Sequence, residues 1–362
     1  MTAAQLPERG LRSRTQALAV LAGAPLFAVA VALGVGALFV LLAAESPASA
    51  YSALLDGSVG SVPALAQSLT TAIPVILTGV GTALAFRVGL FNLGGEGQMI
   101  FGALATAVTG HALAGLPGAL DLVAAVLAGA LAGAAWALLP AWWEAWFRVP
   151  LVITTLLLNY IAALFATYLA VYPLRDKGGG STVAQTKALP GALDLPIVIS
   201  ATPLHLGVVA AAVVPLAVAW LLSRTSLGYA MRMTGLNRDF AEAGGVPMRR
   251  TILITMGLSG ALCGLAGTLL VLGETHRYVN DSVVGPGTAW TGLTAGMLAA
   301  FNPALTAVSG FFLAALQTGG TGLQLRTEVP LQLVNVIQAV IILMVAVRLW
   351  LARQARLGRR PG

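Results

Sequence analysis

The chain has 362 residues, of which 58% are hydrophobic and only 9% are charged, with a formal net charge of +7. Soluble domains carry charge on about a quarter of their residues, so this composition excludes an ordinary soluble protein and predicts a polytopic membrane protein. Most arginines lie in the tails and in loops between apolar runs, which membrane topology explains better than nucleic-acid binding does. The single cysteine, Cys263, excludes an intrachain disulfide.

The first apolar run covers residues 17–44 and follows a basic stretch over 1–16. A signal peptide has an apolar core of about 7–15 residues, whereas a membrane span needs about 20. We therefore expect a retained first span and an N-terminal tail that stays in the cytoplasm. A second span is predicted over 62–86, and Arg87 marks its cytoplasmic end.

Eight more spans are predicted, which gives about ten in all. They cover residues 99–113, 120–147, 151–172, 204–222, 252–272, 290–301, 304–316 and 331–351. The pieces on either side of Asn302-Pro303 are short because this dipeptide interrupts them. An even number of spans places both termini in the cytoplasm, including a basic tail over 352–362. The predicted fold class is an all-α, polytopic transmembrane helical bundle that forms one domain over 17–351.

A polar, glycine-flanked segment over 235–247 lies in the predicted cytoplasmic loop, residues 223–251. Residues 238–243 can form one or two helical turns, and Arg238 and Glu242 are four positions apart, so they can pair on one face. The glycines that follow would end the helix. Two interpretations remain: a short helix offered to a partner in the water, or an ordinary arginine-rich loop of the positive-inside type.

Small residues recur at four-residue spacing in two of the predicted spans. The pairs are Gly129 with Gly133 and Gly260 with Gly264. In lipid, such pairs allow two helices to approach closely. The alternative is that they only reflect a chain rich in alanine and glycine.

Several kinds of catalytic chemistry lack their sequence signatures. The chain has no glycine-rich phosphate-binding loop with its Lys-Ser/Thr end, no His-Glu-x-x-His motif and no paired cysteines. Its three histidines are far apart in the sequence, which does not suit a metal site. We therefore expect no catalytic residues, no metal and no cofactor bound by this chain.

The segment over 92–98 combines polar residues with three glycines, which permit a break or a re-entrant turn at membrane depth. Asn92 can cap a helix, and Glu96 then lies in the first turn, where a negative charge suits the helix dipole. A carboxylate in or near a span is a functional candidate by default. The alternative is that Glu96 only caps the helix or pairs with Arg87.

Other polar side chains fall on apolar spans, where an amide must find a partner. They are Gln67, Thr70, Asn159, Gln317, Asn335 and Gln338. Hydrogen bonding between helices explains them more simply than a pore does. If they line a pore, they suit an uncharged, hydroxylated or nitrogen-rich solute better than an ion.

Four segments carry a family pattern. They are FRVGLFNLGGEGQM over 86–99, ITTLLLNYI over 153–161, the polar loop running into SGALCGLAG over 259–267, and GLTAGMLAAFNP over 292–303. Together they resemble the permease subunits of bacterial ABC importers in the branched-chain amino acid/simple sugar permease superfamily, especially its nucleoside-type branch, which depends on basic membrane lipoproteins. The chain departs from the pattern at residues 150–152, which lack the usual acidic residue. It also has Phe301-Asn302 where the family has a glycine and a basic residue.

The resemblance implies a type II-like importer permease in the bacterial inner membrane. Two permeases, alike or different, would form the pore, separate subunits would hydrolyse ATP, and an extracytoplasmic lipoprotein or periplasmic protein would deliver the solute. Nucleosides are the first expectation, and simple sugars or related solutes are the alternative. The ATPase would grip the polar loop, with coupling residues Asn237, Arg238, Asp239, Glu242, Ala243, Gly244, Gly245 and Val246. We expect a second set to shape the pore or its inner gate: Asn92, Glu96, Gln98 and Asn159.

A function of another class also remains, a secondary transporter driven by an ion gradient. Broken helices suit such a transporter. It normally needs several carboxylates along a path through the membrane, however, and Glu96 is almost alone. An intramembrane enzyme is weaker still, because no group of reactive residues is visible.

Overall fold

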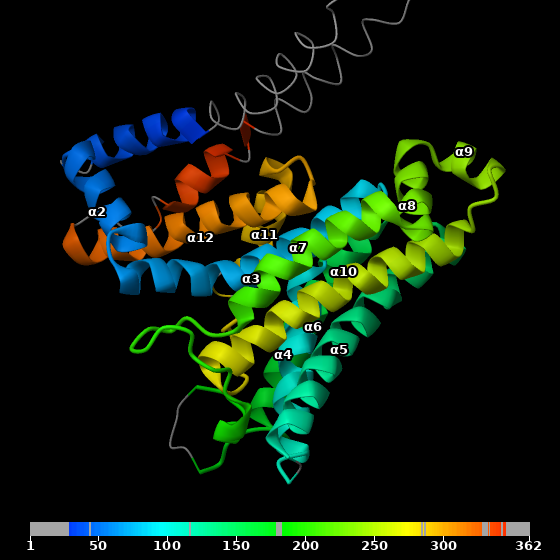
Figure 1. Ribbon diagram of the computed structural model, residues 1–362, viewed down its shortest axis with the longest axis horizontal. Helices are drawn as coiled ribbons and strands as arrows, with labels where there is room; N and C mark the ends of the chain where they lie inside the picture. The colour runs from blue at the N-terminus through cyan, green and yellow to red at the C-terminus, as the bar shows by residue number, and fades with distance from the viewer. Residues whose placement is uncertain are drawn as a thin grey trace, which may run out of the picture. The chain divides into compact units, whose positions relative to one another are not determined.

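Every named element of the chain is a helix, as the sequence predicts (Figure 1). The computed structural model describes residues 29–42, 45–115, 117–178, 183–283, 285, 287–327, 332, 334–341 and 343–344. Contacts divide the chain into two units, residues 1–54 with 320–362 and residues 55–319. The functional residues predicted from the sequence all belong to the second unit.

The first unit contains a helix over residues 29–42 and the start of α2 (Pro47–Val59). The Tyr51 hydroxyl donates a hydrogen bond to the carbonyl oxygen of Leu33. Helix α2 is not expected from the sequence, because its polar residues give no apolar run of span length. The predicted tails over 1–16 and 352–362, and parts of the predicted first and last spans, lie outside the described residues.

The second unit follows the predicted order of helices closely. Its elements are α3 (Val62–Arg87), α4 (Gly95–Ala112), α5 (Gly118–Phe147), α6 (Leu151–Val171), the 3-10 helix η1 (Gly191–Leu193), α7 (Gly207–Arg224), α8 (Ser226–Leu236), α9 (Arg238–Ala243), α10 (Met248–Leu270), the π-helix η2 (Val271–Thr275), α11 (Thr288–Leu298) and most of α12 (Pro303–Arg326), whose residues from 320 onward belong to the first unit. Within the described residues, five helices are long and apolar enough to cross a membrane, and a bent pair over Val29–Leu42 and Pro47–Val59 makes six if counted as one span.

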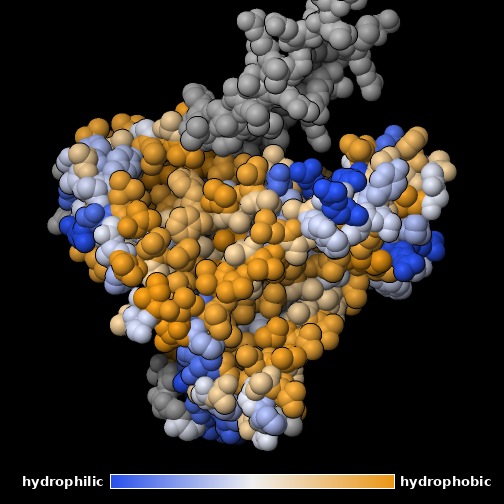
Figure 2. Space-filling view, in the orientation of Figure 1, coloured by the Kyte–Doolittle hydropathy of each residue, from blue (hydrophilic) through white to orange (hydrophobic). Residues whose placement is uncertain are grey.

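Helices α3 and α10 form the centre of the second unit. Most of the apolar stretch of each is buried inside the protein, whereas most of the surface of α5, α6 and α7 is exposed. Hydrophobic side chains cover the visible face over α5, α7 and α10, and hydrophilic ones gather at α8 and α9 and at the opposite end (Figure 2). We call these the α9 end and the loop end. The apolar zone between the two ends is the part of the surface that lipid would surround in a membrane.

Helices α5 and α10 cross at the two glycine pairs, which confirms the close approach predicted for them. A Cβ atom added to Gly133 would lie 2.4 Å from the carbonyl oxygen of Gly260, and one added to Gly264 would lie 2.5 Å from that of Gly129. Each motif therefore packs against the other, backbone on backbone. The glycines are required here because no side chain fits between the two helices.

Two helices begin inside the bundle instead of at its ends. Helix α4 starts four residues earlier than predicted, so Glu96 lies in its first turn. The preceding Asn92 contacts Ser259, which lies about 16 Å along α10 from Met248 at 1.5 Å per residue. The first turn of α11 lies at the same depth, because Ala289 packs against Gly95. The two helix starts therefore meet within the apolar zone.

Candidate functional site

A closed network of hydrogen bonds forms around Asn92, which is fully buried. Its Nδ2 donates to Gln98 Oε1 (3.1 Å) and to Ser259 Oγ (2.9 Å). Its Oδ1 accepts from Gln98 Nε2 (3.0 Å) and from the backbone N–H of Gly94 (2.9 Å). The Ser259 hydroxyl donates to the carbonyl oxygen of Gly81 (2.7 Å). The two amides thus satisfy each other and fix the break between α3 and α4 to α10.

Asn159 on α6 supports the same break from the other side. Its Oδ1 accepts from the backbone N–H of Gly97 (2.9 Å), and its Nδ2 donates to the carbonyl oxygen of Leu93 (2.9 Å). One helix side chain therefore satisfies an orphan donor of α4 and an acceptor of the loop before it. The structure brings together all four residues predicted for the pore or gate, and three of them, Asn92, Gln98 and Asn159, are buried and engaged with protein.

Glu96 differs from these three because its side chain is half-exposed. It interacts with the side chain of Trp290, at the start of α11, and both line a small cavity with Thr82 and Leu293. Arg87 does not bind it: its Nε donates to the carbonyl oxygen of Phe301 (2.8 Å). Sequence reasoning missed Trp290. The available signal was an aromatic residue opening a short apolar piece.

Two of the other polar residues predicted on spans, Thr70 and Gln317, bond within a helix or between helices. Gln317 Nε2 donates to Thr291 Oγ1 (2.9 Å), which joins α12 to α11. The Thr70 hydroxyl donates to the carbonyl oxygen of Ala66 in its own helix (2.9 Å). Gln67 and Asn335 are exposed. The simpler sequence interpretation, hydrogen bonding within the bundle, therefore applies to Gln317.

The predicted short helix over 238–243 is present as α9. Asn237 caps it, because its Oδ1 accepts from the backbone N–H of Phe240 (3.0 Å), and Gly245 ends the turn with a φ of +83°. The predicted pair of Arg238 and Glu242 is wrong. Arg238 Nη1 instead contacts Glu144 Oε1, in the last turn of α5, at 3.1 Å.

The α9 end exposes apolar side chains among its charges. Leu236 is 80% exposed and Phe240 is 63% exposed. Behind them, α8 is pressed against the end of α3, since a Cβ atom added to Gly235 would lie 2.0 Å from the carbonyl oxygen of Arg87. A cavity of about 230 Å³ lies between these elements and is lined by Gly89 and Met248 among others. A movement of α8 toward α3 would therefore displace the end of α3 directly.

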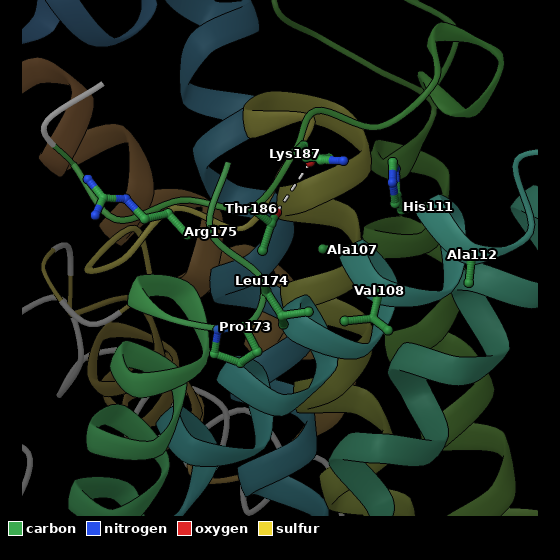
Figure 3. Close-up of a pocket in the computed structure, with 9 residues that line it drawn as sticks. All are labelled: Ala107, Val108, His111, Ala112, Pro173, Leu174, Arg175, Thr186 and Lys187. Atoms are coloured by element: carbon green, nitrogen blue, oxygen red, sulfur yellow. Dashed lines mark hydrogen bonds between the residues drawn. The ribbon is translucent and has the colours of Figure 1, made fainter. Parts of the chain in front are cut away.

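At the loop end, a second cavity of about 290 Å³ lies between the end of α4 and the segment over 173–187 (Figure 3). His111 and Lys187 stand on one side of it, and Arg175 extends toward the other. Thr186 ties this segment to the chain beyond η2, because its N–H donates to the Tyr278 carbonyl oxygen (2.9 Å) and its hydroxyl accepts from Tyr278 N–H (3.0 Å). The described residues at the end of this segment are thus joined to the chain that follows η2.

His205 is buried at the same end, directly before α7. Its Nδ1 accepts from the backbone N–H of Gly207 (3.2 Å), and its ring packs on Gly273 of η2, where no Cβ atom would fit. Desolvation, with a smaller effect from the nearby charge of His276, lowers the pKa of His205 to about 4. Within the described residues, no cluster of His, Cys, Asp or Glu could hold a metal ion.

The known proteins that this chain resembles along most of its length are named as permease proteins of ABC transporters. The family model described as branched-chain amino acid transport system / permease component matches residues 64–346. The guanosine ABC transporter permease protein NupP of Bacillus subtilis is 31% identical over 89% of this chain and 92% of its own length. A glucose ABC transporter permease protein of Haloferax volcanii is 30% identical over 89% and 86%. The nucleoside ABC transporter permease protein NupB of Lactococcus lactis is 28% identical over 90% of both chains.

No solved structure matches the chain. The family model nevertheless covers well over half of the sequence, and the first relatives match along nearly their whole length. The chain therefore belongs to the branched-chain amino acid transport system / permease component family, and it is a multi-pass, non-catalytic permease component of an ABC transporter.

Proposed function

We propose that the protein imports nucleosides as the pore-forming subunit of an ATP-driven importer in the bacterial inner membrane. Two relatives that match along most of the chain are named for guanosine and nucleoside transport, which supports this choice. A third is named for glucose, so simple sugars are the second candidate. Uptake of radiolabelled guanosine and glucose by vesicles that contain the complete transporter separates the two.

The full fold in this proposal is a type II-like permease with about ten spans and both termini in the cytoplasm. Helices α3, α5, α6, α7 and α10 meet the length and hydropathy of a span. The helix over 29–42, the shorter α4, the pair α11 and α12 and the predicted span over 331–351 complete the number. Helices α3 and α5 end near α9, and α10 begins there, so the α9 end is assigned to the cytoplasm, where arginine is favoured.

The partners in this proposal are a second permease, ATPase subunits that hold the ATP, and an extracytoplasmic binding protein. The observation that carries the ATPase contact is the exposed Phe240 on α9. Leu236 is also exposed at this end, and several large apolar side chains exposed together, not a single one, are typical of a docking surface. The remaining coupling residues surround it: Asn237, Arg238, Asp239, Glu242, Ala243, Gly244, Gly245 and Val246.

Two contacts can transmit a push on α9 to the bundle. Arg238 joins α9 to Glu144 at the end of α5, and Gly235 presses α8 against Arg87 at the end of α3. ATP-driven closure of the ATPase subunits would move these helices, and the pore would switch from outward to inward access. Asn92, Gln98 and Asn159 would keep the break before α4 rigid during this movement, while Glu96 faces the pore.

Affinity purification in mild detergent tests the docking surface. We expect the native chain to retain an ATPase subunit, identified by mass spectrometry, and the Phe240→Asp variant to lose it. The matched control is Ile197→Asp, a similarly exposed apolar residue in the loop before α7, which should retain the ATPase. If no ATPase accompanies the native chain, and uptake depends on a proton gradient instead, the ion-coupled alternative replaces this proposal.

A further inference from the structure

Glu96 places a carboxylate deep inside the membrane without fully burying it. The backbone N–H of Gly97 bonds to Asn159, which lies about 12 Å along α6 from Leu151 at 1.5 Å per residue. Asn92 indicates a comparable depth through Ser259, about 16 Å along α10 from Met248. Within the described residues, no ion pair involves Glu96. Because a charged side chain facing lipid at this depth costs several kcal/mol, the half-exposed face of Glu96 must be in contact with water or with protein.

The neighbour of Glu96 on this face is Trp290, which is 43% exposed although it also lies inside the apolar zone. The two side chains interact and line one small cavity. They come from the first turns of α4 and α11, which run in opposite directions from this point. The N-terminal ends of both helices therefore favour negative charge here, and a carboxylate and an aromatic face are presented side by side.

The rest of the cavity offers few other polar groups. Leu93, Ala289 and Leu293 are apolar, and the Thr82 hydroxyl already donates to its own helix. The amide of Asn92 is engaged with Gln98, Ser259 and Gly94. A polyhydroxylated sugar needs several hydrogen-bond partners at once, whereas this notch provides the carboxylate of Glu96, which also interacts with Trp290, and one aromatic plane.

We propose that Glu96 and Trp290 form a recognition point for the transported solute. A planar nitrogen heterocycle stacks on the Trp290 indole, and one of its N–H groups donates a hydrogen bond to the Glu96 carboxylate. The inference rests on the proposed function, because it places the pair on the translocation path, and it adds the chemical class of ligand. It selects the nucleobase, not the ribose, as the part of a nucleoside that the permease recognises.

The first experiment measures ATP-dependent uptake of guanosine by the complete transporter in proteoliposomes. We expect Trp290→Leu to raise KM about tenfold or more, the loss typical of a base–aromatic stack, and Trp290→Phe to stay within about threefold because it keeps a flat ring. Glu96→Gln should also raise KM about tenfold, since a charged acceptor becomes neutral. The control is Trp220→Leu, an exposed tryptophan on α7, which should match the native chain.

The second experiment asks whether this face meets water and solute. In a Cys263→Ala background, Trp290→Cys should react with a membrane-impermeant maleimide in the resting or the ATP-bound complex, and guanosine should slow the reaction at least about threefold, as occupied sites exclude the reagent. Cys263 is the only cysteine of the native chain, so its replacement leaves the new cysteine as the only thiol. Cys263 is buried. Failure to react in both states, or reaction that guanosine does not slow, overturns the recognition point.

The outcomes separate the two levels of the argument. If the native transporter takes up glucose and not guanosine, the proposed nucleoside function fails and the inference fails with it. If guanosine uptake is normal in the native chain and in both Trp290→Leu and Glu96→Gln, the inference alone is wrong. Equal yield and elution volume of all variants in detergent exclude misfolding as the cause of any loss.

Discussion

Arg87, the last residue of α3, donates a hydrogen bond from its Nε to the carbonyl oxygen of Phe301, 2.8 Å away in the turn between α11 and α12. Phe86 stacks on the Phe301 ring, with 4.4 Å between centroids. The turn needs this support because Ala300 and Phe301 have φ values of 49° and 56°, a region that L-residues rarely adopt. Since Gly235 also presses on the end of α3, the elements α8, α3 and α11 meet at one point.

The strain at this turn predicts that Ala300→Gly stabilises the protein. Glycine removes about 1–2 kcal/mol of left-handed strain and costs about 0.4–1 kcal/mol of chain entropy, so a net gain of about 0.5 kcal/mol is expected. The control is Ala307→Gly inside α12, which should cost about 1 kcal/mol. Thermal unfolding in detergent measures both. Equal destabilisation by the two variants would show that the turn is not strained.

The crossing of α5 and α10 predicts a sharp contrast between two glycines of the same helix. Gly264→Ala would place a methyl group 2.5 Å from the carbonyl oxygen of Gly129, so separation of the helices should cost about 1–3 kcal/mol or more. Gly257→Ala meets only Leu138 Cδ2 at 3.6 Å and should be neutral or stabilising, because alanine favours the helix. The unfolding midpoints of the two variants in detergent measure this difference. The prediction fails if Gly264→Ala lowers the midpoint no more than Gly257→Ala does.

The ion pair between Arg238 and Glu144 predicts an effect on coupling that exceeds its effect on stability. Arg238 is 46% exposed, so the pair should contribute less than about 1 kcal/mol to folding. Either reversal alone, Arg238→Glu or Glu144→Arg, places like charges together and should lower ATP-dependent uptake severalfold. The exchanged double variant should recover most of the uptake. No recovery in the double variant would mean that the charges act independently.

Burial of His205 predicts a loss of stability in acid. The unfolded chain binds the proton near pH 6.5, whereas the folded protein binds it only near pH 4. The contribution of neutral His205 to the free energy of unfolding is therefore fully present above about pH 6.5. It is lost as the pH falls toward 4, by up to about 3 kcal/mol. His205→Asn keeps an acceptor for the N–H of Gly207 and cannot titrate, so its unfolding midpoint should fall less over this range.

The control for this pH effect is His111→Gln, because His111 is exposed at the end of α4. That variant should keep the acid sensitivity of the native protein. If His205→Asn and the native chain lose stability in parallel, another group is responsible for the loss.

The sequence alone predicted the helical class, the five spans that correspond to α3, α5, α6, α7 and α10, the short helix α9 and close helix approach at the two glycine pairs, but not which helices cross there. These features depend on composition and on spacings of a few residues, which act locally. The residues over 92–98 were also recognised as a break in the bundle, because glycine and asparagine favour such a break wherever they occur. The apolar run begins at Met99, so hydropathy predicts a span that starts four residues after the first residue of α4.

Only the tertiary structure decided which polar groups face each other. Glu96 meets Trp290, Arg238 meets Glu144 instead of Glu242, and Asn92 bonds to Ser259 across 167 positions. Such partners follow from the packing of helices that are distant in the chain, and no local pattern encodes them. The same packing buries Asn92, Gln98 and Asn159 and leaves Glu96 half-exposed, because only the complete bundle determines which side of a helix is covered.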